Sequence, residues 1–399
     1  MFEKRKKDND SRALYDRSNN NSVKVQTLNK DWRRLSNESR FHKFVFKNDD
    51  DAKEDASKID EELGETKEVF KVHYGHILWI FDYYCAVGTT LGRTAYSMQM
   101  NSYAKFIQDC KVPDDQVSVE DCTKIFIVVN YEEDKKSYQS EVNEDKALMR
   151  HELCEALVRI AVQKYSKQTA DVSDCLDLLL NHIMLHIPKE AIIDPDEFRE
   201  ERFYTEDMER TVKKYQKDLG EVYKHYSCLN PVQGKPKFGI DEIVQLFQDA
   251  SMLGNHISSR ELRLVFFKSR MTVKDEVVHR SKFTSLSWWE FIEALSRLAD
   301  CTSLPTDEDL EQIAAQSMMD FELKLDKLVD PEKKAKLRQR RNSAGMMTPK
   351  SRPMHEKFET FVGCMMGRLG VHYKGRLRAG GLSFVPKYLT QEQISLFAY

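Results

Sequence analysis

Apolar residues recur over residues 77–165 at the i, i+3, i+4, i+7 spacing that places side chains on one face of a helix. The same series of spacings returns, in the same order, over residues 219–300. Tyr84 corresponds to Tyr226 at an offset of 142, and Asp109 corresponds to Asp249 at an offset of 140. Because the offset drifts slowly, only the loops change length. The sequence therefore predicts a mainly α fold with a duplicated four-helix unit.

The gaps between these helices carry a second pattern. Five residues before the first apolar position of each second helix stand four apolar residues, Met98, Leu148, Phe238 and Leu286. One residue before it stand Ser102, Glu152, Glu242 and Glu290. An EF-hand has an apolar residue at loop position 8 and a Glu at position 12, so the chain resembles two EF-hand pairs, like the two lobes of calmodulin. We expect Met98 to face Leu148, and Phe238 to face Leu286, across short β-contacts.

The loops depart from the ion-binding pattern. All four are longer than the twelve residues of an EF-hand loop, and the first and third begin with almost no carboxylates. We therefore expect no cofactor and no bound metal. The second loop keeps an alternative open, because Asn130, Glu132 and Asp134 have the 1, 3, 5 spacing and Glu152 stands where it would close a calcium site.

The composition fits globular helical units with solvated arms. Apolar residues make up 41% and charged residues 32%, with a mean hydropathy of −0.61 and a net charge of −3. No apolar run reaches the roughly 18 residues of a spanning helix, and the first residues do not resemble a signal peptide. The eight Cys are scattered without a C-x-x-C motif, which favours reduced thiols in the cytosol.

The chain divides into six predicted parts. They are an extended or disordered N-terminal arm (1–66), a first EF-hand-like lobe (67–167), a helical connector (168–216), a second lobe (217–300), a charged helix (301–341) and a basic, aromatic C-terminal arm (342–399). Trp32 and Phe41 lie in a basic stretch of the first arm, which we interpret as a strap for its own lobe or for a partner. Pro188 is expected to end the first connector helix, and Pro331 to break the charged helix or start a second one.

Candidate partner-binding residues lie near the C-terminus. Trp288 and Trp289 open the last helix of the second lobe. We expect one of them to pack in the core and the other either to line a groove for a partner or to pack in the core as well. Residues 332–378 hold thirteen Lys or Arg and three acidic residues, which indicates a basic arm. The candidate contacts are Arg338, Arg340, Arg341, Arg376 and Arg378 in this stretch and Phe384 and Tyr388 after it, and the candidate phosphorylation sites are Ser343 and Thr348.

The sequence contains none of the common catalytic motifs that we looked for. No P-loop, dinucleotide fingerprint, kinase signature, G-x-S-x-G or H-E-x-x-H motif is present. His73 with His76, and His182 with His186, are spaced like metal ligands, but no third ligand stands near either pair in the sequence, so packing or surface roles are favoured. We expect no enzyme activity.

Several helix phrases, DLGEVYKHYS, LFQDASML, FREERFYTED and ELCEALVRIAVQKY, are similar to a family of EF-hand-like proteins from the cilia and flagella of single-celled eukaryotes. The resemblance covers about residues 68–300 and implies a structural or adaptor role on the axoneme, on or inside the doublet microtubule. Its expected partners are tubulin and other axonemal proteins, with no membrane, nucleic acid or small-molecule substrate. Two alternatives remain open. One is a calcium-responsive sensor, and the other is a regulatory subunit that grips a partner helix.

Overall fold

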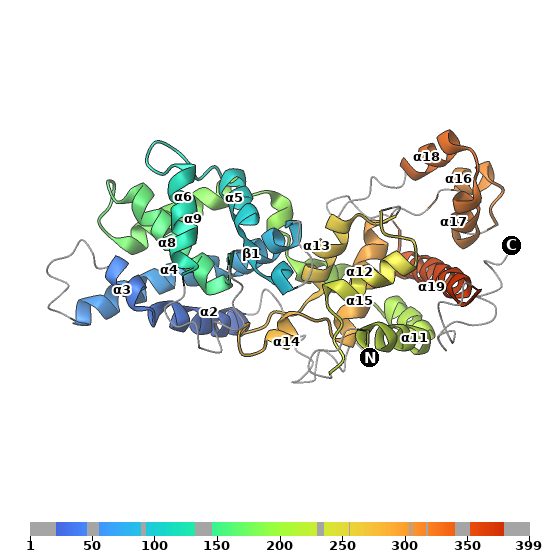
Figure 1. Cartoon of the computed structure of the whole chain (residues 1–399), viewed down its shortest axis with the longest axis horizontal. Helices are drawn as coiled ribbons and strands as arrows, with labels where there is room; N and C mark the ends of the chain where they lie inside the picture. The colour runs from blue at the N-terminus through green and yellow to red at the C-terminus, as the bar shows by residue number, and fades with distance from the viewer. Residues whose placement is uncertain are drawn as a thin grey trace. The chain divides into compact units, whose positions relative to one another are not determined.

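The computed structural model describes residues 21–45, 56–88, 93–131, 146–229, 235–254, 256–302, 305, 307–316, 318–339 and 352–378. Over these ranges the chain is mainly helical, as the apolar periodicity predicted (Figure 1). It forms two compact units. The N-terminal unit comprises the described residues up to Asp196 together with residues 271–283, and the C-terminal unit comprises residues 197–270 and those from 284 onward. No helix within these ranges is long and apolar enough to cross a membrane.

Each unit contains a ring of four helices. In the N-terminal unit these are α4 (Ala56–Val87), α5 (Met100–Asp109), α6 (Val119–Val129) and α8 (Arg150–Tyr165). In the C-terminal unit they are α11 (Glu206–Ser227), α12 (Ile240–Asp249), α13 (Ser259–Ser269) and α15 (Trp288–Cys301). In both rings the first helix packs on the second, the second on the third, the third on the fourth and the fourth on the first. The duplicated apolar pattern therefore builds the same packing order twice.

The turn between the second and third helices is the same in both units. A residue with positive φ follows the second helix, Lys111 at 50° and Ser251 at 51°. The backbone N–H of the following residue donates to a carbonyl oxygen five residues earlier, as in a Schellman motif. Val112 donates to Ile107 at 3.0 Å, and Met252 donates to Phe247 at 2.9 Å. Each third helix then begins with a capping box, at Ser118 in one unit and at Ser258 in the other. Local hydrogen bonding thus repeats along with the apolar positions.

A short β-contact joins the long loops of the N-terminal unit, as predicted, and a single backbone hydrogen bond joins the expected pair in the C-terminal unit. Strand β1 (Met98–Gln99) pairs antiparallel with β2 (Ala147–Leu148), and Met98 stands opposite Leu148. In the C-terminal unit the N–H of Leu286 donates to the carbonyl oxygen of Phe238 at 2.8 Å. All four residues are buried.

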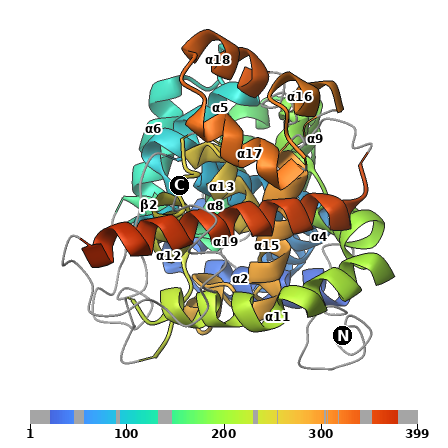
Figure 2. The same ribbon diagram turned by 90° about the vertical axis from the view of Figure 1, so that its right-hand side faces the viewer.

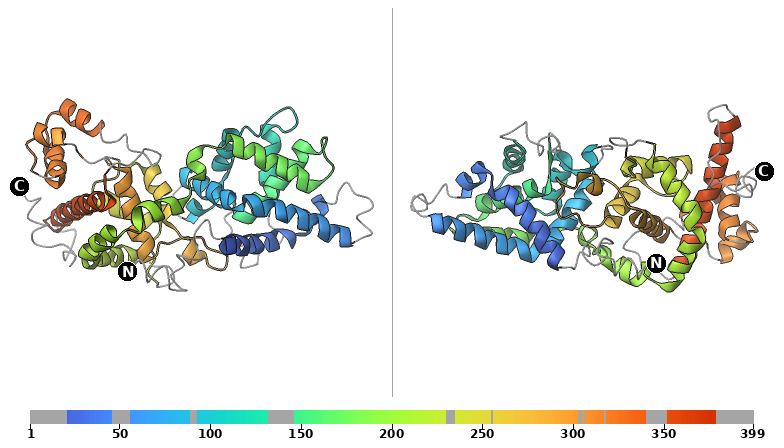
Figure 3. Two further views of the ribbon diagram at one scale, coloured as in Figure 1. Left: turned by 180° about the vertical axis from the view of Figure 1, so that it is seen from behind. Right: turned by 90° about the horizontal axis from the view of Figure 1, so that it is seen from below.

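The expectation of an extended or disordered arm over residues 1–66 is wrong for residues 56–66, which begin α4, and for residues 21–45. Residues 21–45 form α2 (Asn21–Ser36) and α3 (Ser39–Val45). Helix α2 packs on α4 and α8, and Figure 3 shows α2, in dark blue, beside α4, in lighter blue. Val23, Leu28, Trp32 and Leu35 are buried there, so the basic stretch is a strap on its own unit. Its helical periodicity was hidden because Thr27 and Asp31, which are polar, occupy buried positions of the same face.

The connector residues add further helices to the rings. Helix α9 (Val172–His186) packs on α4 and α8, and it ends just before Pro188, as predicted. The short elements of the two units are η1 (Arg93–Tyr96), η2 (Lys189–Ile192), α10 (Pro195–Phe198), the π-helical turn η3 (Arg199–Phe203) and α14 (Arg280–Phe283).

Residues 305–341 do not form the single long helix that we expected. They contain α16 (Asp307–Gln312), α17 (Met318–Lys327) and α18 (Pro331–Gln339). Ala314, at a φ of 52°, ends the first of these, and Pro331 starts the last. Phe321, Leu325 and Leu337 form a small core between them.

Much of the expected C-terminal arm is part of the C-terminal unit. Residues 354–378 form α19 (Met354–Arg378), which Figure 2 shows in red, running past α11 and α15. It also packs on α12 and α17. Phe358, Val362, Met365 and Leu369 are fully buried on its inner face. The sequence of residues 355–370 already allows a short helix, and the structure extends it over Met354–Arg378.

Candidate functional site

A buried glutamate of the fourth helix holds two arginines in the C-terminal unit. Glu293 in α15 is fully buried, and Arg297, one turn later, donates from Nε to Glu293 Oε1 at 2.9 Å. Arg199, at the start of η3, donates from Nε to both oxygens of Glu293 at 3.0 Å. The guanidinium carbon of Arg297 lies 4.4 Å from the ring centroid of Phe198. We call these four residues the C-terminal arginine cluster.

Arg199 also reaches the end of the third helix. Its Nη2 donates to the carbonyl oxygens of Lys268, at 3.4 Å, and Arg270, at 3.3 Å, where α13 ends. The carbonyl oxygens of a final helical turn have no partner within the helix, and that end carries partial negative charge. The guanidinium of Arg199 therefore acts as a fixed cation at the start of the fourth loop.

The N-terminal unit contains the same arrangement. Glu155 of α8 is buried and pairs with Arg159 at 2.7 Å and with Arg40 of α3 at 3.3 Å. Arg40 donates to the carbonyl oxygens at the end of α6, to Val128 at 2.9 Å and to Val129 at 2.8 Å. The guanidinium carbon of Arg159 lies 4.4 Å from the ring centroid of Phe44. We call Arg40, Phe44, Glu155 and Arg159 the N-terminal arginine cluster.

The sequence did not lead us to either cluster, although the Glu–Arg pair of each one is visible in the repeat. Glu155 with Arg159 and Glu293 with Arg297 stand at one offset of 138 within the repeated phrases ELCEALVRIA and EFIEALSRLA. The other arginine of each cluster precedes the first ring helix of its unit, at a different distance, so no repeat register reveals it. In each cluster a guanidinium, which is always charged, is balanced by a buried carboxylate.

The glutamates at loop position 12 serve as helix caps. Glu152, Glu242 and Glu290 each accept a hydrogen bond from the backbone N–H three residues earlier, those of Met149 (2.7 Å), Gly239 (2.8 Å) and Ser287 (2.5 Å). This is the carboxylate half of a capping box. A calcium site needs six to eight converging oxygens, and one oxygen of Glu152, the candidate closing ligand, is already engaged.

The residues of the second loop divide between the described and undescribed ranges. Asn130 donates from Nδ2 to the carbonyl oxygen of Ala147 at 3.0 Å, and its Oδ1 accepts from the N–H of Lys146 at 2.8 Å. Glu132 and Asp134 lie outside the described residues. Within the described ranges, no group of three His, Cys, Asp or Glu is arranged to hold a metal.

The candidate tryptophans, histidines and cysteines all pack against neighbouring parts of the chain. Trp288 is half-buried in an aromatic group, with its ring centroid 5.8 Å from that of Tyr223 and 6.0 Å from that of Phe291, and Trp289 is half-buried beside it. The rings of His182 and His186 lie 4.5 Å apart, and His182 Nε2 lies 3.0 Å from the carbonyl oxygen of Lys111. Burial lowers the pKa of both His73 and His76. Cys110, Cys122, Cys154 and Cys175 are buried, as expected, and form no disulfide.

For the candidate partner-binding and phosphorylation residues of the basic arm, the structure describes no side chain. Arg340, Arg341, Ser343, Thr348, Phe384 and Tyr388 lie outside the described residues, and the side chains of Arg338, Arg376 and Arg378 are not described either. Two cations of α19 point inward. Lys357 Nζ donates to the carbonyl oxygen of Asp300 at 2.7 Å, and Arg368 pairs with Asp326 at 2.5 Å. These two charges therefore stabilise the C-terminal unit.

Comparison of the chain with known protein families, with curated proteins and with solved structures finds no match. The likeness to EF-hand-like ciliary proteins therefore stays a prediction from the helix phrases, and the two arginine clusters are interpreted from their own geometry.

Proposed function

We propose that this chain is a non-catalytic structural adaptor built on two EF-hand-like lobes that keep their shape without calcium. The observation that carries the proposal is the arginine cluster, which occurs once in each unit. In each, a guanidinium bridges a buried glutamate to the carbonyl oxygens at the start of a lengthened loop. The guanidinium supplies positive charge at the start of the loop, and the buried carboxylate balances it. The loop therefore has no need of a calcium ion to compensate its charge.

The packing of α19 favours a scaffold over a regulatory subunit. A subunit that grips a partner helix presents an apolar groove between its helices. In the C-terminal unit the faces of α11, α12 and α15 are covered by α19, a helix of the same chain, whose inner side is fully buried. In the N-terminal unit, helices α2 and α9 similarly pack on α4 and α8. The chain thus supplies its own helical ligands.

We place this adaptor on the ciliary axoneme, bound to the microtubule lattice or to other axonemal proteins. The support is the likeness of the helix phrases, together with the positive charge of the C-terminal arm, which suits the acidic surface of tubulin. Lys357 and Arg368 are used within the C-terminal unit, so we assign the attachment to other cations, Arg340 and Arg341 first among them, and to the aromatic residues after 378.

Co-sedimentation with microtubules tests the attachment. Arg340→Glu with Arg341→Glu, and separately a truncation after residue 378 that removes Phe384 and Tyr388, should both lower the bound fraction, while α19 stays intact. Binding should weaken with salt, because the Debye length falls from about 10 Å at 0.1 M to about 3 Å at 1 M. Arg210→Glu, at an exposed position of α11, is the matched charge control. Variants that bind as well as the parent chain contradict this attachment.

The same assay separates the adaptor from a calcium sensor. An adaptor of this kind binds equally in calcium and in a chelator, whereas a sensor binds in one condition and releases in the other. Fluorescent tagging in a ciliated cell then tests the location, and a signal confined to the cytoplasm with none along the axoneme would falsify the axonemal role.

A further inference from the structure

Residues 271–283 lie between α13 and α15, two helices of the C-terminal unit, yet they belong to the N-terminal unit. This segment is the lengthened fourth loop of the repeat. Met271, Val273, Asp275, Glu276, Val277 and Phe283 are buried in it. A loop that only connects two helices runs over the surface, exposed to solvent. Burial of six of its thirteen positions indicates that the N-terminal unit binds this segment.

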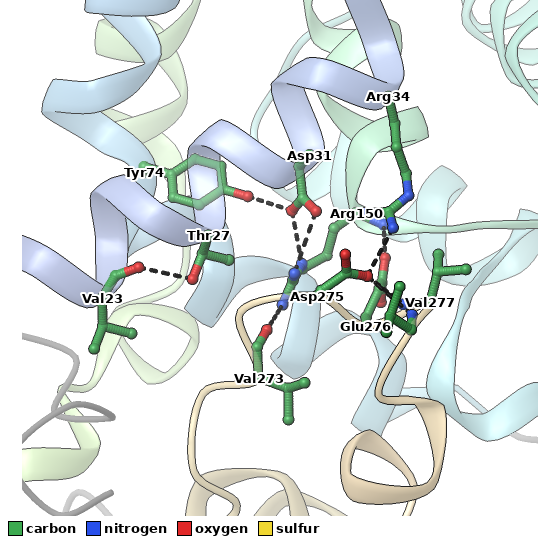
Figure 4. Close-up of polar contacts among 11 residues, drawn as sticks. Val23, Thr27, Asp31, Arg34, Tyr74, Arg150, Val273, Asp275, Glu276 and Val277 are labelled. Atoms are coloured by element: carbon green, nitrogen blue, oxygen red, sulfur yellow. Dashed lines mark hydrogen bonds and ion pairs between the residues drawn. The ribbon is translucent and has the colours of Figure 1, made fainter. Parts of the chain in front are cut away.

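Arg150, the first residue of α8, is the main point of attachment (Figure 4). Its backbone N–H donates to Glu276 Oε1 at 2.9 Å, and its Nη1 donates to the carbonyl oxygen of Val273 at 3.0 Å. A carboxylate at a helix N-terminus is favoured by the free N–H groups and by the helix dipole. Arg150 thus holds the segment through both its backbone and its side chain.

The opposite side of the guanidinium is anchored in the N-terminal unit. Nε of Arg150 donates to Asp31 Oδ2 at 2.9 Å, and Asp31 also accepts from the hydroxyl of Tyr74, as Figure 4 shows. All three side chains are buried. Burial raises the pKa of Glu276 and that of Tyr74. Because removal of one partner leaves a buried charge unpaired, this network is strongly constrained.

A second set of contacts flanks the first. Nη2 of Arg34 in α2 pairs with Asp275 Oδ1 at 2.7 Å, and the same oxygen accepts from the N–H groups of Val277 and Val278 at 3.2 and 2.9 Å. The ends of the segment add Lys274 to Gln26 (2.7 Å) and Arg280 to Ser97 (3.4 Å). Contacts to α2, to α8 and to the residues before β1 give the segment one defined position in the N-terminal unit.

We propose that residues 271–283 are a clasp, donated by the fourth loop of the repeat and bound by Arg150 and Arg34, which couples the unfolding of the two units. The chain enters the N-terminal unit at Met271 and leaves it after Phe283, so release of the clasp frees the ends of α13 and α15. The inference rests on these contacts alone and stands apart from the EF-hand likeness and from the axonemal role.

Hydrogen exchange of the full chain, followed peptide by peptide, tests the clasp. Arg150→Gln and Glu276→Ala should speed exchange in residues 271–283 and at the adjoining ends of α13 and α15, by about tenfold to a hundredfold, the value of a hydrogen bond to a charged group. Denaturant unfolding followed by the same peptides should change from one transition to two. Glu276→Gln, which keeps the acceptor oxygen, should restore part of the protection.

Lys164→Gln is the matched control. It removes another buried cation of α8, which binds the carbonyl oxygen of Val112 at 2.7 Å, away from residues 271–283. It should speed exchange within the N-terminal unit and leave α13 and α15 protected. The clasp is excluded if Arg150→Gln loosens α2, α4 and α8 while residues 271–283 exchange as in the parent chain. It is equally excluded if Arg150→Gln and Lys164→Gln give the same pattern.

Discussion

The hydroxyl of Tyr226 donates a hydrogen bond to Asp249 Oδ2 at 2.9 Å, from the first ring helix of the C-terminal unit to the second. Tyr84 makes the same bond to Asp109 Oδ2, also at 2.9 Å, in the N-terminal unit. Burial raises the pKa of Tyr84, so its hydroxyl remains a donor. A side-chain bond of equal length at equivalent positions argues that the duplication extends to polar contacts.

Removing either hydroxyl should have a similar, modest cost. Tyr226→Phe and Tyr84→Phe should each lower the free energy of unfolding of the chain by about 1 kcal/mol, the net value of one intramolecular hydrogen bond. Because the two bonds lie in different units, the double variant should show the sum of the two losses. Urea unfolding measures this. A cost above about 3 kcal/mol for one and none for the other would contradict an equivalent role.

The arginine clusters should be the most sensitive charged positions in the rings. Arg199→Met leaves the carboxylate of Glu293 buried with one cation fewer, and should lower the free energy of unfolding by about 3–5 kcal/mol. Arg40→Met should cost less, because the side chain of Arg40 is 16% exposed against 2% for Arg199. Arg210→Met, in an exposed ion pair, is the control and should change stability by less than about 1 kcal/mol. Equal effects for all three contradict the clusters' structural role.

Acid should weaken the N-terminal unit through His151. Burial lowers the pKa of this imidazole to about 4, with Arg34, Arg150 and Arg40 adding to the effect and Asp31 opposing it. The unfolded chain takes up a proton below its ordinary pKa of 6.5, while the folded unit stays neutral. Stability is therefore complete above about pH 6.5 and falls as the pH drops toward 4, by about 3 kcal/mol in all.

His151→Gln is the variant that isolates this effect. It should flatten the decline in unfolding free energy between pH 6.5 and 4 in urea titrations, whatever its cost at pH 7. If the variant and the parent chain lose stability in parallel over this range, the imidazole is not the source.

Truncation should reveal α19 as part of the core. A chain that ends at residue 339 lacks the buried side chains of Phe358, Val362, Met365 and Leu369 and should lose the cooperative unfolding of the C-terminal unit. A basic arm that only solvates the chain would be dispensable. In the full chain, Phe358→Ala should cost about 3–5 kcal/mol in urea unfolding, the usual penalty for an emptied aromatic site. Glu356→Gln, at a half-buried position of α19, serves as the control.

Apolar periodicity predicted the ring helices because their inner faces are continuous, and the position of Phe238 and Leu286 followed from the same register. It did not predict α2, where Asp31 is buried as the partner of Arg150, more than a hundred residues away. It also did not predict the break at Ala314, where φ is 52° and the chain turns back before Phe321 and Leu325 of the small core. Long-range ion pairs and local backbone reversals of this kind leave no periodic trace.

The sequence alone also could not show that Glu152 caps a helix. A glutamate at loop position 12 reads as an ion ligand or as a cap, since both need a carboxylate three residues into the helix. The hydrogen bond from the N–H of Met149 at 2.7 Å favours the cap. The arginine that supplies the neighbouring cation, Arg40, comes from outside the repeat, so spacing within the loop did not point to it.

Thermal unfolding of the full chain with and without millimolar calcium tests the calcium-independent scaffold most directly. The account predicts the same melting temperature and the same tryptophan fluorescence in calcium and in a chelator. Binding to the folded state would instead stabilise it by about 2.7 kcal/mol at a hundredfold excess over the dissociation constant. A calcium-dependent rise in melting temperature that Glu152→Gln abolishes would contradict the account and restore the second loop as an ion site.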